Sequence, residues 1–220
     1  MKLLNKNMKN LTIINNPVIA QLGLNLHDIN TKPFEYRENA RKLGIHMGSE
    51  ISNYNILPTK KLKVKTPLGT LSSTVVDDNK IGIVNVLRAG TSFALGMGEV
   101  FPNSTISFIS AWREGVKGNI SAKTEYMRGV QSLKGKYVII SDLALASGVS
   151  ILACLDVLSK YIKPEKTIIL SLHCAKEGVK NIYKSYPQIK IYSVFGPSEM
   201  NDHCYILNGP GDCGDRSFNT

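Results

Sequence analysis

Residues 137–150 carry the sequence YVIISDLALASGVS, in which an apolar run leads into an acid and then into small and hydroxyl residues. The run from Val138 to Ile140 is short and β-branched, which is typical of a strand buried on both faces of a parallel sheet. Apolar positions recur on one side of residues 150–162, which predicts a helix. The stretch therefore predicts a buried strand, a loop at the carboxyl end of that strand, and a helix beginning near Ser150.

Strand-like and helical segments alternate along the rest of the chain after residue 80. Their alternation predicts an α/β fold, with a mostly parallel sheet flanked by helices and right-handed crossovers. Ligands bind beyond the carboxyl ends of the strands in such sheets, so the site is expected there. The other predicted strands cover 81–87, 105–109, 167–172 and 190–195, and a second helix covers 175–186.

The part of the chain before residue 80 has a different pattern. Pro33 begins a predicted N-terminal helix over 33–49. Two strand-like runs at 62–64 and 71–76 are joined by turn residues at 66–69, which predicts a small hairpin or hood. Lysines alternate with apolar residues in its first strand, as in a half-buried strand with one solvated face. We interpret these lysines as surface charge.

Composition indicates one globular domain over residues 1–220, because 220 residues with 43% hydrophobic content can form a large core. No signal sequence or membrane-spanning run is expected, so the predicted location is cytoplasmic. The polar, glycine-rich segment 114–136 is expected to be a mobile loop or a hairpin. Reduced thiols rather than disulfides are expected at Cys154, Cys174, Cys204 and Cys213.

The net charge of +10 favours anionic partners, namely nucleic acid, an anionic membrane surface or a phosphorylated small molecule. Charge alone does not choose among these classes. Aromatic residues do not interleave with the clustered lysines, which disfavours single-stranded nucleic acid. Zinc binding is not expected from His173–Cys174 and His203–Cys204, because their spacing matches no common zinc site.

The loop after Ile140 has the chemistry of a phosphate site. Gly148 would allow a phosphate to approach the backbone, the following helix would present free N–H groups, and Ser147 and Ser150 would add hydroxyl donors. Asp142 would accept hydrogen bonds from ribose hydroxyls above the phosphate. The alternative is that Ser150 only caps the helix and Asp142 only closes a turn.

Residues 138–150 resemble the phosphoribosyl diphosphate (PRPP) motif of type I phosphoribosyltransferases. Most relatives carry two adjacent acids there, whereas this chain carries Asp142 alone after Ser141, as in the uracil phosphoribosyltransferase family. The segment 209–216 near the C-terminus, GPGDCGDR, is the most specific part of the resemblance. Further resemblances occur in order at 66–69, 87–90 and 112–113.

The resemblance implies a type I phosphoribosyltransferase-like domain that transfers the phosphoribosyl group of PRPP to uracil, giving UMP and diphosphate in pyrimidine salvage. The region 114–136 would be a flexible flap carrying Tyr126 and Arg128, and 196–220 a base-recognition tail. The catalytic residues would be Arg88, Arg113, Asp142 and Asp212. The PRPP site would comprise Arg88, Arg113, Asp142, Leu143, Ala144, Leu145, Ala146, Ser147, Gly148, Val149, Ser150 and Asp212. The uracil site would comprise Ile206, Gly211, Asp212 and Cys213.

The resemblance also implies Mg²⁺ carried by the diphosphate without protein ligands of its own, a homo-oligomer (dimer or tetramer) and room for a nucleotide effector. No membrane partner is expected, and nucleic acid is disfavoured. Two parts of the resemblance, Arg88 and the glycine-rich tail, also have a physical explanation. Guanidinium groups such as that of Arg88 would stabilise departing diphosphate, and a glycine-rich tail could meet uracil with backbone groups.

Bland interpretations remain open: Arg88 could be structural, and 209–214 could be a plain surface turn. Two other functions also remain open, a same-fold RNA-binding regulator without turnover and a phosphoribosyltransferase for a different base. The chain departs from the family's usual residues at His27, Leu143, Ala144, Val149, Asn208 and Asn219.

Overall fold

The main sheet is built almost entirely of parallel strands. The computed structural model describes residues 8–116 and 119–220, and the side chains of 113–120 lie outside that description. Within these residues the strand order is β1–β10–β9–β7–β4–β5–β6, with β8 pairing with β9, and only β5 and β6 are antiparallel. The strands are β1 (Leu11–Ile13), β4 (Ile81–Leu87), β5 (Thr105–Val116), β6 (Asn119–Arg128), β7 (Tyr137–Ser141), β8 (Ala144–Leu145), β9 (Thr167–Ala175) and β10 (Lys190–Ser198).

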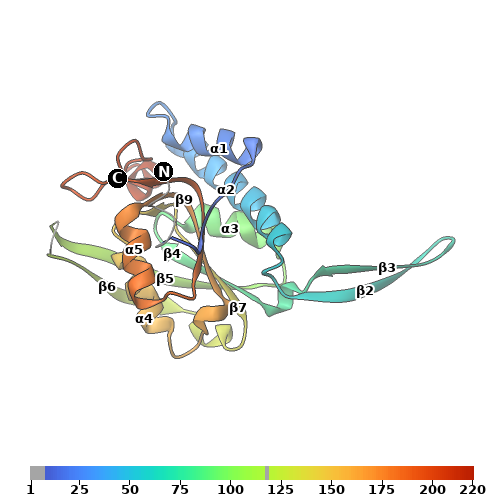
Figure 1. The fold of residues 1–220 in the computed structure, drawn as a ribbon. Helices are drawn as coiled ribbons and strands as arrows, with labels where there is room; N and C mark the ends of the chain where they lie inside the picture. The colour runs from blue at the N-terminus through green and yellow to red at the C-terminus, as the bar shows by residue number, and fades with distance from the viewer. Residues whose placement is uncertain (1–7, 117–118) are drawn as a thin grey trace.

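Helices cover both faces of this sheet (Figure 1). One face packs against α1 (Pro17–His27), α2 (Pro33–Glu50) and α3 (Thr91–Val100), and the other against α4 (Val149–Leu158) and α5 (Lys176–Ser185). A short helix, α6 (Cys213–Phe218), ends the chain. The predicted α/β class, with its parallel sheet and flanking helices, is confirmed.

Most predicted elements are present, with shifted ends. The helix predicted over 33–49 is α2, and the helix predicted over 150–162 is α4, which ends at Leu158. Sequence reasoning did not predict α1, although Asn16 supplies a start signal: its side chain accepts hydrogen bonds from the N–H groups of Val18 and Ile19.

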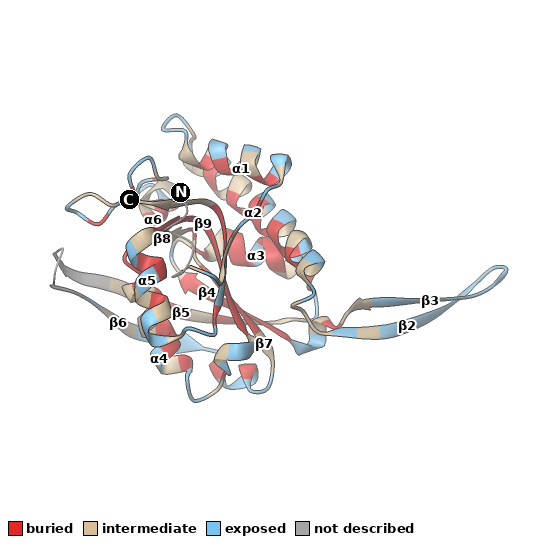
Figure 2. Ribbon diagram, viewed as in Figure 1, coloured by how far each residue is buried: buried red, intermediate tan, exposed pale blue. Residues whose placement is uncertain are grey.

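The hairpin of β2 (Thr59–Thr66) and β3 (Gly69–Val76) projects away from the body of the molecule (Figures 1 and 2). The expectation of a half-buried strand is wrong for this chain, because Leu62 and Val64 are 47% and 45% exposed. The hairpin extends beyond the sheet and the helices, so the rest of the chain leaves its apolar side chains uncovered.

The segment predicted as a loop or hairpin at 114–136 divides into two parts. Its first part lies in the antiparallel hairpin of β5 and β6, in which Val116 pairs with Asn119. Its second part contains a 3₁₀ turn at Val130–Leu133, where Val130 and Leu133 are buried in the core. The β5–β6 hairpin therefore ends at Arg128, and Val130 and Leu133 after it are held in the core.

The strand order places a crevice at the carboxyl ends of β4 and β7. These strands are neighbours, with Asn85 opposite Ser141. The crossover after β4 runs through α3 to β5 on one side, whereas the crossover after β7 runs through α4 to β9 on the other. A reversal of this kind leaves an open crevice in which ligands of α/β sheets bind.

Two smaller expectations concern thiols and membranes. Cys154, Cys174, Cys204 and Cys213 are all free, as predicted, and all four are buried. Among the helices of the described residues, none combines the length and the apolar character needed to cross a membrane.

Candidate active site

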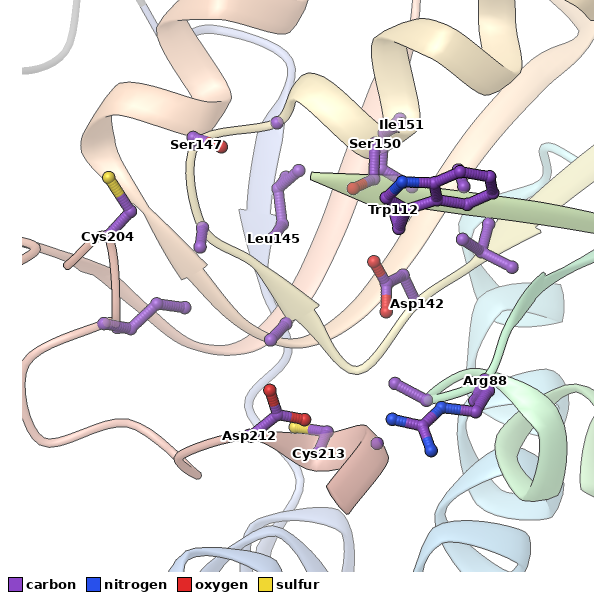
Figure 3. Close-up of a pocket in the computed structure, with 18 of the residues that line it drawn as sticks. Arg88, Trp112, Asp142, Leu145, Ser147, Ser150, Ile151, Cys204, Asp212 and Cys213 are labelled. Carbon is purple, nitrogen blue, oxygen red and sulfur yellow. The ribbon is translucent and has the colours of Figure 1, made fainter. Parts of the chain in front are cut away.

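A cavity of about 450 Å³ opens at the carboxyl ends of β4 and β7. This volume is within the usual range for small-molecule sites. Four stretches of chain line it: 86–89 after β4, 110–112 on β5, most of 142–151 between β7 and α4, and the tail at 204–206 and 210–214. Figure 3 shows Arg88, Asp142 and Asp212 directed toward the same space from three of these stretches.

The loop before α4, called the anion cradle below, has a backbone geometry suited to an anion. Gly148 is the N-cap residue of α4 with φ of +81°, a left-handed conformation that favours glycine, and no side chain caps the helix. The first N–H groups of α4 therefore have no partner within the helix, at the positive end of its dipole. Ser150 lies inside the first turn and lines the cavity, so the interpretation of Ser150 as a mere helix cap is wrong.

Ser147 adds a buried hydroxyl to this cradle. Its side chain lines the cavity, is only 2% exposed, and its Oγ has no hydrogen-bond partner. A buried hydroxyl without a partner costs folding free energy, which a ligand that accepts its hydrogen bond would recover. Ser147 therefore indicates a site built for a polar ligand.

Helix α5 supports the cradle from behind. Asn181 Nδ2 donates to the backbone carbonyl of Ser147 at 2.9 Å. Gly178 packs so closely that a Cβ atom there would lie 2.2 Å from the carbonyl oxygen of Ala146. Sequence reasoning missed both residues; the glycine in the first turn of the predicted helix 175–186 was the available signal.

Two residues expected at the PRPP site do not line the cavity. The side chain of Leu143 is buried in the core, and its carbonyl oxygen accepts hydrogen bonds from the N–H groups of Leu172 and His173. Val149 is also absent from the cavity wall, although its N–H belongs to the first turn of α4. By contrast, Ala144, Leu145, Ala146, Ser147, Gly148 and Ser150 line the cavity as expected.

Asp142 and Asp212 bring two carboxylates to the cavity wall. The backbone N–H of Asp142 is bonded to the carbonyl of Leu170, which fixes the end of β7 against β9. Asp212 is the N-cap residue of α6, and its side chain accepts a hydrogen bond from the N–H of Asp215 at 3.0 Å. The backbone of each acid is thus held at the end of an element, Asp142 after β7 and Asp212 before α6.

Arg88 lines the cavity while being held by the C-terminus of the chain. Its guanidinium donates to Asp215 Oδ1 at 2.8 Å and to Thr220 Oγ1 at 3.0 Å. The Arg88 loop packs on the end of β7, because a Cβ atom on Gly90 would lie 2.6 Å from the carbonyl oxygen of Ser141. The partners of Arg88 could not be predicted, since Asp215 lies 127 residues away in sequence.

The tail forms the opposite wall of the cavity. Ile206, Gly211, Asp212 and Cys213, the expected uracil residues, all line it. The interpretation of 209–214 as a plain surface turn is wrong, because Pro210, Cys213 and Gly214 are buried. Burial raises the pKa of the Cys213 thiol to about 12, so this thiol stays neutral near pH 7.

The remaining expected residues belong to the β5–β6 hairpin. Arg113 pairs with Ala122 in the strand register, but its side chain lies outside the described residues. Tyr126 and Arg128 are exposed on β6 and do not line the cavity. Trp112, the only tryptophan, does line it and was not predicted as a site residue. Its place beside Arg113 was the available signal.

The two His–Cys pairs do not gather into a metal site. His173 uses both ring nitrogens in hydrogen bonds, to His27 and to Ser198. Within residues 8–116 and 119–220, no three His, Cys, Asp or Glu side chains are grouped so that they could hold a metal ion.

The family model and the sequence relatives agree on one family. The family model described as uracil phosphoribosyltransferase matches residues 13–220. The uracil phosphoribosyltransferase of Pyrococcus furiosus is 32% identical over 203 residues, covering 92% of this chain and 86% of the relative. That of Ralstonia pickettii is 32% identical over 212 residues, covering 96% and 95%. The solved structure of the AQ2163 protein from Aquifex aeolicus is similar with a TM-score of 0.85 and 27% identity, covering 94% of this chain and 97% of that one.

Proposed function

Since the chain belongs to the uracil phosphoribosyltransferase family, we propose that it transfers the 5-phosphoribosyl group of PRPP to uracil, giving UMP and diphosphate. The observation that carries this proposal is the convergence of the anion cradle, Arg88, two carboxylates and the glycine-rich tail on one cavity. A ligand with a phosphate at one end and a base at the other would match this distribution of groups.

The 5-phosphate of PRPP would bind in the cradle before α4. Backbone N–H groups at the helix start and the hydroxyls of Ser147 and Ser150 would donate to its oxygens. Gly148 allows the phosphate to approach the backbone, and the orphan Ser147 hydroxyl would gain its missing acceptor. Asp142, at the end of β7, would accept from the ribose hydroxyls.

The diphosphate would lie toward Arg88, and we place Arg113 there as well by resemblance to the family. The charge that develops on diphosphate as it leaves is stabilised by guanidinium donors at that position. Arg88 would then exchange at least part of its contact with Asp215 and Thr220 for diphosphate oxygens.

The uracil ring would lie against the tail, between Ile206 and the turn at Gly211, Asp212 and Cys213. Main-chain N–H and C=O groups of this turn can pair with the donor and acceptors along one edge of the pyrimidine. The Cys213 thiol, neutral because burial raises its pKa, would be a wall of the pocket rather than a nucleophile.

Catalysis in this arrangement rests on positioning and charge stabilisation. The bond from ribose C1 to the diphosphate oxygen breaks as C1 gains oxocarbenium character. The uracil nitrogen attacks from the opposite face, which inverts the configuration at C1, and the uracil proton passes to water or to the departing diphosphate.

Asp142 and Asp212 offer carboxylate oxygens, the donor type that Mg²⁺ prefers. The ion would reach the site with the diphosphate and would keep several of its water ligands. When bound, Mg²⁺ would neutralise part of the diphosphate charge. Asp212 and Asp142 are the residues of this chain that could contact it or its water ligands.

We further place the flap function in the β5–β6 hairpin, where closure of Tyr126 and Arg128 over the cavity would exclude water. Residues 1–220 would act as one domain, with 196–220 recognising the base, in a cytoplasmic enzyme.

The β2–β3 hairpin presents Leu62, Val64 and Leu71 to solvent, and Val64 pairs with Leu71 across the strands. This uncovered apolar face supports a homo-oligomer, dimer or tetramer. A nucleotide effector is a further ligand suggested by the resemblance to the family.

The decisive experiment is diphosphate release from PRPP with Mg²⁺ present, using uracil, orotate, adenine and hypoxanthine in parallel. Uracil alone should support rapid release. Turnover with another base instead would identify a phosphoribosyltransferase of different specificity. Tight, salt-dependent RNA binding without turnover of any base would overturn the enzymatic proposal in favour of a regulator.

A further inference from the structure

The turn that would face uracil is tied to the body of the molecule by contacts made behind the cavity. Gly211 has φ of +73°, and the residues on either side of it, Pro210 and Asp212, lie in the same turn before α6. If uracil is recognised by backbone groups, the position of this main chain decides how well the base binds. A residue that fixes the turn from behind would therefore affect uracil without touching it.

Arg216 makes such contacts. Its Nη1 atom donates to the carbonyl oxygen of Pro210 at 2.7 Å and to that of Leu26 at 2.6 Å. Its Nη2 atom donates to the carbonyl oxygen of Asp28. One guanidinium thus joins the tail to the end of α1, although Leu26 lies 190 residues earlier in sequence.

The surroundings of Arg216 hold the guanidinium in one place. The guanidinium carbon, Cζ, of Arg216 lies 4.6 Å from the centroid of the Tyr36 ring, and Tyr36 is fully buried on α2. The Leu26 carbonyl belongs to the last turn of α1, where carbonyls have no partner within the helix and the dipole favours a cation. A planar guanidinium can serve several carbonyls at fixed angles, which the compact ammonium of lysine cannot reproduce.

We propose that Arg216 is a positioning residue for the nucleobase, acting through the Pro210 carbonyl on the turn at Gly211, Asp212 and Cys213. Arg216 is not among the residues that line the cavity, so it does not act by contacting substrate. Of the groups expected to bind PRPP, only Asp212 belongs to this turn, whereas the anion cradle and the Arg88 loop lie on other stretches of chain. Loss of the Arg216 contacts should therefore weaken uracil binding more than PRPP binding.

The test, which rests on the proposed uracil phosphoribosyltransferase activity, compares steady-state kinetics of the wild type, Arg216→Ala and Arg216→Lys. Arg37→Ala is the matched control, because Arg37 Nη1 also ties α6 to the body of the molecule, through the Ser217 carbonyl at 2.6 Å. KM is measured for uracil at saturating PRPP and for PRPP at saturating uracil, with a denaturation midpoint for each variant.

For Arg216→Ala we expect KM for uracil to rise at least about tenfold while KM for PRPP changes less than about twofold. KM for uracil of Arg216→Lys should lie between the values of the wild type and Arg216→Ala. Arg37→Ala should leave the ratio of the two KM values unchanged. A parallel rise of both KM values, or an unchanged KM for uracil, overturns the proposal. If Arg216→Ala does not fold, Arg216→Lys decides by the same criterion. A wild type without uracil turnover would overturn the proposed function as well, whereas the variant outcomes overturn only the role of Arg216.

Discussion

His27 and His173 form a ring-to-ring hydrogen bond, with Nε2 of His27 2.8 Å from Nδ1 of His173. His27 Nδ1 donates to the Gly23 carbonyl, 2.7 Å away, and in the neutral ring Nε2 then accepts from His173 Nδ1. His173 Nε2 in turn accepts from the Ser198 hydroxyl at 2.8 Å. Both rings are neutral in this arrangement, which joins the end of α1 to β9 and to the start of the tail.

Acid should destabilise the fold through this pair. Burial, and then the neighbouring His27, lowers the pKa of His173 from 6.5 to about 4. Burial also lowers the pKa of His27, and the charge of Arg216 acts in the same direction. As pH falls from 6.5 toward 4, the unfolded chain binds protons that the folded pair does not, so the free energy of unfolding decreases.

Urea denaturation between about pH 7.5 and 5 checks this prediction. His173→Gln should flatten the dependence of the unfolding free energy on pH, whereas His203→Gln, at an exposed position, should not. Equal slopes for the wild type and His173→Gln would contradict the assignment.

Ser147→Ala should weaken PRPP binding without weakening the unliganded protein. The Ser147 hydroxyl is buried without a partner, so its removal should leave the unfolding free energy unchanged or raise it by up to about 1 kcal/mol. Loss of a donor to phosphate should raise KM for PRPP about tenfold or more. Denaturation without ligand and PRPP kinetics measure the two effects. Ser159→Ala, on the far end of α4, should change KM little, and a destabilised Ser147→Ala with normal KM would refute the phosphate role.

Gly178→Ala should damage the PRPP site from outside the cavity. The new methyl group would meet the Ala146 carbonyl at 2.2 Å and push the cradle out of place. We expect KM for PRPP to rise and stability to fall by about 1–3 kcal/mol. Gly48→Ala, in α2, is the matched control, because a Cβ atom there would make only ordinary van der Waals contacts at 3.5 Å. Similar effects of both substitutions on PRPP kinetics would contradict this support role.

Arg88→Lys should affect catalysis far more than stability. The Arg88–Asp215 pair is largely exposed, so its loss should change the unfolding free energy by less than about 1 kcal/mol. Lysine keeps the charge but loses the guanidinium fork, so kcat/KM for PRPP should fall at least about tenfold. Arg41→Lys, whose arginine pairs with Glu38 and Glu99 away from the cavity, should behave like the wild type in kinetics. Unchanged PRPP kinetics for Arg88→Lys would exclude a diphosphate role.

Local pattern was enough to predict the strand–loop–helix unit around Asp142 and Gly148, because its elements depend on residues within a few positions of one another. The same is true of the parallel sheet, whose strands are short, β-branched and continuous. Leu143 was misassigned for a related reason. Its position in the loop suggested a ligand contact, whereas the pairing of the loop with β9 turned its side chain into the core. Nothing local to the loop specifies that pairing.

Sequence reasoning alone predicted a strand–loop–helix unit with the chemistry of a phosphate site and, by resemblance, the family of the chain. The groups around this loop became visible in the folded chain: Asp215 and Thr220 on Arg88, Gly178 behind Ala146, and Arg216 between α1 and the tail. Nearby residues favour a helix, a strand or a turn, whereas strand order and packing set the partners of each side chain. Those arise from contacts between segments that lie apart in the sequence, by 32 residues for Gly178 and Ala146 and by 190 for Arg216 and Leu26, and no periodicity in the sequence encodes them.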